Sequence, residues 1–250
     1  MKEQKNNIRL DKVIGLITLI TILIFVGMIY IDFRPSKKSV ETANETETTE
    51  AVNEATDAQN GKSVTVCIDA GHGGTDGGSG TSGKEKTQTL AVALKVQKYL
   101  EESGVNVVMT RTTDVAVTDE QRVQTGNQAG AAAMVSIHRN YYEGPENVYG
   151  AEAWIHSSGS ADAKSLAAGI LEKLHTAVDE DNRGVKLGSV DGSGDYYFNT
   201  HSKCASCILE LGYMTSTADD ALVTTDIDAA SKAVADGIIN YLKIMGYLNG

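Results

Sequence analysis

From residue 62 onward, short apolar segments alternate with longer amphipathic segments along the chain. Several of the short segments are nearly continuous apolar runs, which is typical of parallel strands that are covered on both faces. They predict five strands: VTVCID (Val64–Asp69), VNVVMT (Val105–Thr110), AMVSIH (Ala133–His138), AEAWIH (Ala151–His156) and CILEL (Cys207–Leu211).

The amphipathic segments between the strands have the spacing of helices. Gly104 follows the first of them as a stop signal, and Thr118-Asp-Glu-Gln121 has the pattern of a capping box that opens the second. The alternation predicts an α/β class fold, a single domain over residues 62–250 with a mainly parallel, twisted sheet and helices on both faces. The predicted helices are Thr89–Ser103, a helix that starts after Thr118, Ala161–Val178 and Asp226–Met245.

An uncharged apolar run, Val13–Ile31, lies near the start of the chain. Its length is close to the roughly 20 residues that span a bilayer. The run ends without the small residues of a signal-peptide cleavage site, so we expect an uncleaved transmembrane helix rather than a secretory signal. Residues 1–12 then form a cytoplasmic tail, and the domain that follows lies outside the cell membrane as part of a single-pass protein.

Residues 32–61 connect this predicted anchor to the domain. Ser39–Asn60 carries acidic residues but no Lys or Arg, and valine is its largest apolar side chain. Such a segment cannot bury enough apolar surface to fold, so we expect an acidic, disordered stalk. The whole chain has 22 Lys and Arg against 33 Asp and Glu, a net charge of −11. That balance argues against a nucleic-acid partner, because phosphate binding needs clustered cations.

The glycine-rich loop Gly71–Gly78 raises the question of a nucleotide site. A phosphate-binding loop needs Ser or Thr after Gly-Lys, and here Gly83-Lys84 is followed by Glu85. The dinucleotide spacing in Gly78–Gly83 begins too far beyond the strand, so no nucleotide is predicted. Cys204 and Cys207 lack a second cysteine pair for a four-thiolate zinc site. Cys67 and Cys207 are interpreted as small apolar strand residues.

Three ionisable residues follow or occupy the ends of predicted strands: His72, His138 and Glu210. Ligands of open α/β sheets bind beyond the carboxyl ends of the strands, so these side chains are expected to converge. Two imidazoles and a carboxylate leave an open position on a tetrahedral Zn²⁺, as in hydrolytic sites. Glu85 is the preferred carboxylate ligand, because it precedes a predicted helix whose start should lie near the glycine loop. Glu210 lies in an apolar strand, where an unpaired carboxylate is costly unless it has a function.

Several segments, in this order, resemble the zinc-dependent N-acetylmuramoyl-L-alanine amidases with an Amidase_3-type catalytic domain, over about Val64–Tyr247. The resemblance implies that His72, Glu85 and His138 bind one Zn²⁺ and that Glu210 is the catalytic carboxylate. The segments are VCIDAGHGGTDGG, GKEKTQTLAVALKV, RTTDVAVTDEQRV, AAMVSIHRN, NRGVKLG and CILELGYMTS.

The activity implied by this resemblance is hydrolysis of the amide between N-acetylmuramic acid and L-alanine in peptidoglycan, on the cell-wall side of the membrane. Glu210 would take a proton from water activated by zinc and deliver it to the leaving amine. Arg139 departs from the small residue that is common in the family, and its side chain is expected to be solvated. Two alternatives stay open: another murein zinc hydrolase, such as a peptidase or deacetylase, and a non-catalytic wall-binding or regulatory protein.

Overall fold

The computed structural model describes residues 63–80, 83–144 and 148–249. They form a six-stranded sheet in the order β2-β1-β3-β6-β4-β5. Four neighbouring strand pairs are parallel, and only β4 and β6 pair antiparallel. The strands are β1 (Thr65–Ala70), β2 (Asn106–Met109), β3 (Ala133–Asn140), β4 (Ala151–Ile155), β5 (Asn182–Leu187) and β6 (Ala205–Tyr213).

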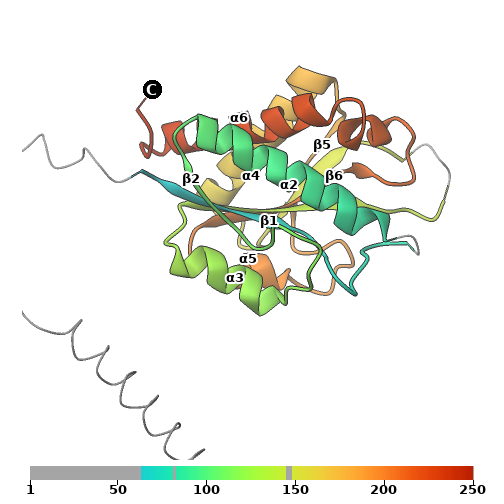
Figure 1. Ribbon diagram of the computed structural model, residues 1–250, viewed down its shortest axis with the longest axis horizontal. Coiled ribbons are helices and arrows are strands. Elements are labelled where there is room, and N and C mark those ends of the chain that lie inside the picture. The colour runs from blue at the N-terminus through green and yellow to red at the C-terminus, as the bar shows by residue number, and fades with distance from the viewer. Residues whose placement is uncertain (1–62, 81–82, 145–147, 250) are drawn as a thin grey trace, which may run out of the picture. The chain divides into compact units, whose positions relative to one another are not determined.

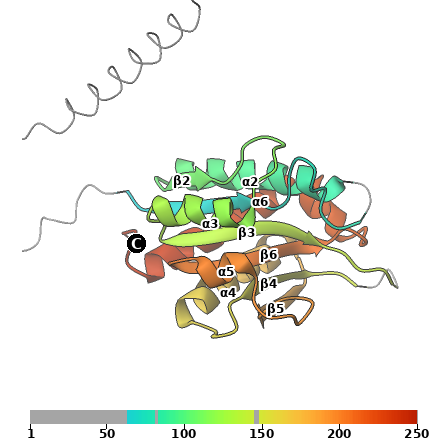
Figure 2. The same cartoon turned by 90° about the horizontal axis from the view of Figure 1, so that it is seen from below.

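Helices cover both faces of the sheet (Figures 1 and 2). One face carries α2 (Lys84–Glu102), α4 (Ala161–Val178) and α6 (Ile227–Ile244), and the other carries the shorter α3 (Asp119–Gln128) and α5 (Tyr197–His201). A 3₁₀ helix, η1 (Asp219–Val223), follows β6. The prediction of a single α/β domain with a mainly parallel sheet is therefore confirmed within these residues.

The two faces have different cores. The larger core lies under α2, α4 and α6, and the smaller one, under α3 and α5, consists of Cys67, Val123, Met134, Phe198 and Ile208. Successive side chains of a strand point to opposite faces. Val135 and Ile137 of β3 therefore belong to the larger core, whereas Met134 belongs to the smaller one. The same alternation places His138 on the face of α3 and α5.

The helix signals read from the sequence are found in the structure. Gln121 N–H donates to Thr118 Oγ1 at 3.2 Å and Thr118 N–H to Gln121 Oε1 at 2.9 Å, so the capping box of α3 is present. Gly104 has φ 79°, a left-handed conformation that glycine adopts readily after a helix end. The range predicted for α4 is confirmed, whereas α2 begins at Lys84, five residues before the prediction.

Two elements and one strand direction differ from the predictions. The sequence NRGVKL of β5 is polar and partly exposed, so it lacks the apolar run of a covered strand, and α5 has too few residues for a helical stripe. Because β4 pairs antiparallel with β6, both β4 and β5 run opposite to the other strands. The sheet is thus mixed, although mostly parallel.

The predicted anchor Val13–Ile31 and stalk 32–61 lie outside the described residues. Within the described ranges, the structure has no helix with the length and apolar character that crossing a membrane requires.

Candidate metal centre

The three residues predicted as zinc ligands come together near the carboxyl ends of β1 and β3. Glu85 Oε1 lies 2.9 Å from His72 Nε2 and 3.3 Å from His138 Nδ1, and the two nitrogens are 3.1 Å apart. His72 follows β1, Glu85 lies in the first turn of α2, and His138 is on β3. Among the described residues, this is the group of ligand-type side chains close enough together to hold a metal ion.

The spacing of these three atoms fits a tetrahedral Zn²⁺. With zinc–ligand bonds of about 2.1 Å, ligand atoms of a tetrahedral site lie about 3.4 Å apart. Two imidazoles and a carboxylate are also the ligand types of catalytic zinc sites that keep a fourth position open. Burial alone would raise the pKa of Glu85, but His138 and His72 hold it well below its usual range, so the carboxylate stays ionised.

Further hydrogen bonds orient two of these ligands. Asp76 Oδ2 lies 2.9 Å from Nδ1 of His72, which leaves Nε2 facing the centre. Burial lowers the pKa of His72, but the carboxylates of Glu85 and Asp76 outweigh it and raise the pKa overall. Glu85 accepts backbone N–H bonds from Ser79 at 2.6 Å and from Arg139 at 3.1 Å. Partners of this kind fix the ring and carboxylate orientations that a metal site needs.

The glycine loop carries His72 in an unusual conformation. His72 has φ 62°, a left-handed backbone that non-glycine residues rarely adopt. Arg122 Nη2 donates to the His72 carbonyl at 2.9 Å, and Arg111 Nη2 donates to that of Gly71 at 2.8 Å. A Cβ on Gly71 would lie 2.5 Å from the His138 ring. The absence of a side chain there lets the loop approach His138.

Glu210 lies beside this centre on β6, where its Cα pairs with that of His138. The residue is 8% exposed, and its Oε2 has no hydrogen-bond partner. Burial raises the pKa of Glu210 to about 7; His138 opposes this shift, while the carboxylates of Glu85 and Glu152 add to it. A carboxylate oxygen without a partner, next to three convergent ligands, is available to exchange a proton.

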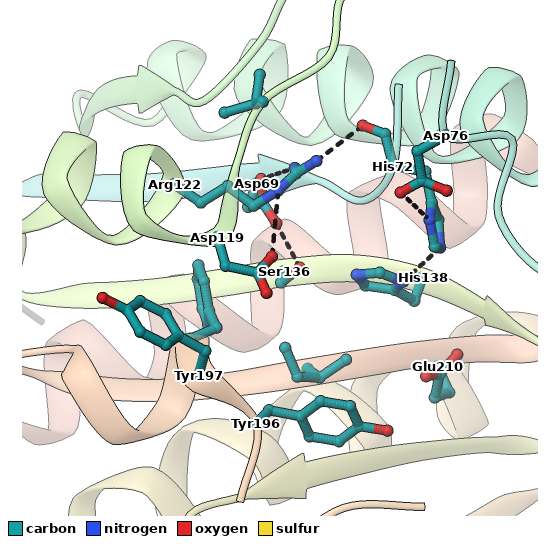
Figure 3. A pocket seen from close by; sticks show the side chains of 13 residues that line it. Asp69, His72, Asp76, Asp119, Arg122, Ser136, His138, Tyr196, Tyr197 and Glu210 are labelled. Carbon is teal, nitrogen blue, oxygen red and sulfur yellow. Dashed lines mark hydrogen bonds and ion pairs between the residues drawn. The ribbon is translucent and has the colours of Figure 1, made fainter. Parts of the chain in front are cut away.

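A pocket of about 240 Å³ adjoins the centre on the face of α3 and α5 (Figure 3). Its inner end is the pair His138 and Glu210, and Tyr197 and Asp119 lie at its other end. The residues that line it are Asp69, His72, Asp76, Val117, Asp119, Arg122, Ser136, His138, Tyr196, Tyr197, Phe198, Ile208 and Glu210.

Comparison with known proteins gives the family of this domain. Residues 66–240 match the Amidase_3 family, described as N-acetylmuramoyl-L-alanine amidase. The chain belongs to this family. It is 30% identical over 183 residues to N-acetylmuramoyl-L-alanine amidase LytC of Bacillus subtilis, covering 72% of this chain and 36% of LytC. It is 32% identical over 184 residues to the probable cell wall amidase LytH of Staphylococcus aureus, covering 71% of this chain and 58% of LytH.

A solved structure agrees with this membership. N-acetylmuramoyl-L-alanine amidase AmiC2 of Nostoc punctiforme superposes with a TM-score of 0.65 at 30% identity, covering 72% of this chain and 97% of AmiC2. The amidase domain of this chain therefore has the family fold.

The prediction that Arg139 of this amidase domain is solvated is wrong. β3 extends to Asn140, so Arg139 alternates onto the face opposite His138 and is 2% exposed. Its guanidinium donates to Gln88 Oε1 at 3.0 Å and to the Tyr213 carbonyl at 3.2 Å. Arg139 therefore joins the start of α2 to the end of β6.

The other histidines and the cysteines lie outside the metal centre of the amidase domain. His156 pairs with Asp195, His175 is exposed on α4, and His201 stacks on Tyr197. Cys67, Cys204 and Cys207 are free thiols.

The sequence interpretation missed Asp76 and the pocket residues of α5. The sequence could have pointed to Asp76 as a partner of His72, because it follows His72 by four residues in the same glycine loop. Tyr196 and Tyr197 had none, because their helix is too short to leave a pattern.

Proposed function

We propose that this domain hydrolyses the amide between the lactyl group of N-acetylmuramic acid and L-alanine in peptidoglycan, and that His72, Glu85 and His138 hold one Zn²⁺. The observation that carries the proposal is the convergence of these three side chains beside Glu210. Membership of the amidase family supports the choice of substrate.

A zinc ion held by these ligands supplies a Lewis acid, which makes water more acidic and polarises a carbonyl. The protein's own side chains orient the ligands and transfer the proton. Asp76 holds His72 with Nε2 toward the centre. Glu210 uses its unpartnered Oε2 to take a proton from the attacking water.

The same Glu210 then gives that proton to the leaving nitrogen as the carbon–nitrogen bond breaks. One water is consumed for each bond. The lactyl group stays on the sugar as a carboxylic acid, and the stem peptide is released with a free amine.

The alternative murein hydrolases would cut a different bond. A peptidase would shorten the stem, and a deacetylase would release acetate, whereas an amidase releases intact stem peptides. Mass spectrometry of murein digested by the full-length protein separates the three. A non-catalytic wall-binding protein would release none of these products.

Two substitutions test the roles within the site. Glu85→Ala removes a metal ligand, so both zinc content and hydrolysis should fall. Glu210→Gln keeps all three ligands, so zinc should stay near one equivalent while turnover falls by about two or more orders of magnitude. Glu172→Gln, at an exposed position on α4, is the matched control.

Circular dichroism shows whether each of these variants is folded. A folded Glu210→Gln protein without zinc would make Glu210 a ligand. A folded, zinc-loaded and fully active one would assign the proton transfer to another group.

We further propose that Val13–Ile31 anchors the protein in the cell membrane, with residues 1–12 inside and the amidase domain outside. An uncharged run of this length supports the proposal. Fractionation should leave the full-length chain in the membrane pellet. A shortened form in the medium, starting beyond residue 31, would indicate a cleaved signal instead.

A further inference from the structure

The edge of the sheet that lies opposite the metal centre carries apolar side chains that the fold leaves exposed. We infer that this edge of the domain docks on the outer surface of the cell membrane, with side chains at the end of α6 inserted between the lipids. The inference goes beyond the proposed amidase function, and it rests on the proposed membrane anchor Val13–Ile31.

The course of α6 places its last residues at this edge. β6 ends near the metal centre, η1 follows it, and α6 then runs back along the sheet. It packs on α4, since a Cβ on Gly237 would lie 2.5 Å from the Cα of Ile170. Figures 1 and 2 both show the C-terminal end on the same side of the domain as the start of β1. The end of α6 and the metal centre therefore lie at opposite edges of the sheet.

Three large apolar side chains at the end of α6 are exposed, and we call them the membrane patch. Ile244 is 64% exposed, Met245 36% and Tyr247 50%, whereas Tyr241 and Leu242, one turn earlier, are buried in the larger core. The N–H of Met245 donates to the Tyr241 carbonyl at 3.0 Å, and that of Tyr247 to the Leu242 carbonyl at 2.8 Å. These bonds hold the patch on the buried part of the helix. Apolar side chains grouped in this way, unlike scattered ones, mark an interaction surface.

The point at which the chain enters the domain favours a lipid bilayer as the partner of this patch. The described residues begin at Ser63, directly before β1, so the chain enters at the same edge. Residues 32–62 separate this entry from the proposed anchor. Even fully extended, a connection of this length reaches only about 100 Å. Tethering also raises the effective concentration of a weak partner, to the millimolar range for short flexible connections. Weak apolar contacts are then sufficient for docking.

The side chains of the patch suit the interface of a bilayer. Ile244 and Met245 offer apolar groups to the acyl chains, and the ring of Tyr247 is of the kind that is enriched at the headgroup level. Lys243, which is exposed beside them, can extend its charged end to the headgroups. The whole chain has a net charge of −11, so attraction to anionic lipids is not the source of binding. Insertion of apolar side chains supplies it instead.

Docking at this edge would orient the metal centre away from the bilayer. Glu210 follows Ala205, the first residue of β6, by five positions. At about 3.3 Å per residue, this separates Glu210 from the docked edge by about 17 Å along the strand. The proposed catalytic residues would then face the cell wall from a fixed height above the membrane.

The test places a tryptophan in the patch and measures its quenching by lipids. The chain has a single tryptophan, Trp154, which packs against the smaller core and gives the same background in every sample. Full-length Tyr247→Trp is reconstituted in phosphatidylcholine vesicles with or without bromine atoms near the start of the acyl chains. Because an inserted ring lies about 5–10 Å into the bilayer, close to these atoms, its emission should fall by at least about half.

Matched variants control for position and for charge. Tyr142→Trp replaces a tyrosine of similar exposure, 45%, beyond the end of β3 at the metal-centre edge, and it should keep its emission. Ile244→Asp, added to Tyr247→Trp, places a charge in the patch and should restore most of the emission. Leu94→Asp makes a similar change at an exposed position in the middle of α2 and should not restore it. Thermal unfolding shows whether each variant is folded.

The outcomes separate this inference from the proposals on which the chain's function rests. If the full-length chain does not float with the vesicles, the anchor and the docking are both overturned. If it floats but Tyr247→Trp is quenched no more than Tyr142→Trp, or if quenching survives Ile244→Asp, the anchor stands and the docking is refuted. Cross-linking of two copies through the patch, without quenching, would assign the patch to a second copy of this chain. Hydrolysis of a soluble muramyl–L-alanine amide by the same samples tests the amidase function independently.

Discussion

Arg139→Met should destabilise the domain without emptying the metal centre. The guanidinium is buried between α2, the end of β6 and η1. Besides the bonds to Gln88 and Tyr213, it donates to the carbonyl oxygens of Gly212 at 3.4 Å and Asp219 at 3.3 Å. Methionine fills a similar volume but donates none of these bonds.

The magnitude follows from these four bonds. At about 1 kcal/mol of net stability each, their loss costs about 4 kcal/mol, because the acceptors stay buried. The substitution also removes the desolvation penalty of the buried charge, which offsets part of this loss. We therefore expect a net loss of about 3 kcal/mol of stability. For a domain of this size that corresponds to a fall in Tm of roughly 10 °C.

The assay is urea and thermal unfolding of Arg139→Met beside the wild type, with zinc content measured on the same samples. The bond from the Arg139 backbone N–H to Glu85 survives the substitution, so zinc should remain bound. Lys98→Met removes an exposed cation from α2 and should change stability by less than about 0.5 kcal/mol. An Arg139→Met protein as stable as this control would refute the reasoning.

Three further predictions concern other positions. Asp76→Asn removes the negatively charged partner of His72 Nδ1 and should weaken zinc affinity by about 10- to 100-fold in a chelator competition, with the fold intact; unchanged affinity would contradict this role. Burial raises the pKa of Glu180 to about 7 from 4.5, so its stabilising contribution is complete below pH 4.5 and is lost as the pH rises through 7. The free energy of unfolding of Glu180→Gln minus that of the wild type should therefore be larger at pH 8 than at pH 5. An equal difference at both pH values would argue against this prediction. Thr118→Ala removes the cap of α3 and should cost about 1 kcal/mol in urea unfolding; no loss would mean that the helix start is held by other contacts.

The sequence was sufficient to predict the side chains at the ends of parallel strands. His72 and His138 were found because apolar runs ended at polar residues, and parallel strands bring their carboxyl ends to one edge of a sheet. Glu210 was found because a carboxylate inside an apolar strand is costly unless it has a function. Glu85 was found from its position after the glycine loop, at the start of a helix. In each case a local sequence pattern predicted the strand or helix. The rule that ligands bind beyond the carboxyl ends of parallel strands then predicted that the side chains lie close together.

Contacts between distant residues left no such pattern. Arg122 binds Asp69 and the His72 carbonyl across about fifty positions of the chain, and neither partner follows from periodicity. Arg139 was misplaced for a different reason. The predicted strand ended at His138, so the next residue was expected to lie in a loop. In the structure β3 continues for two more residues, and the guanidinium of Arg139 therefore points to a covered face of the sheet.

The reversed direction of β4 explains why the rule about strand ends applies to only part of the sheet. Because β4 runs antiparallel to β6, its first residues reach the metal centre and its last residues lead away from it. His156, which follows the end of β4, therefore cannot replace a metal ligand. Glu152, the second residue of the same strand, instead lies directly opposite Glu210.

The two carboxylates that this pairing brings together have different surroundings. Glu152 accepts hydrogen bonds from Asn140, Trp154 and Arg183, so its oxygens are committed to the fold. Glu210 keeps one buried oxygen without a partner. Since a group that must take up and release a proton needs a free oxygen, the hydrogen bonds of Glu152 leave Glu210 as the member of the pair that can serve as the proton carrier.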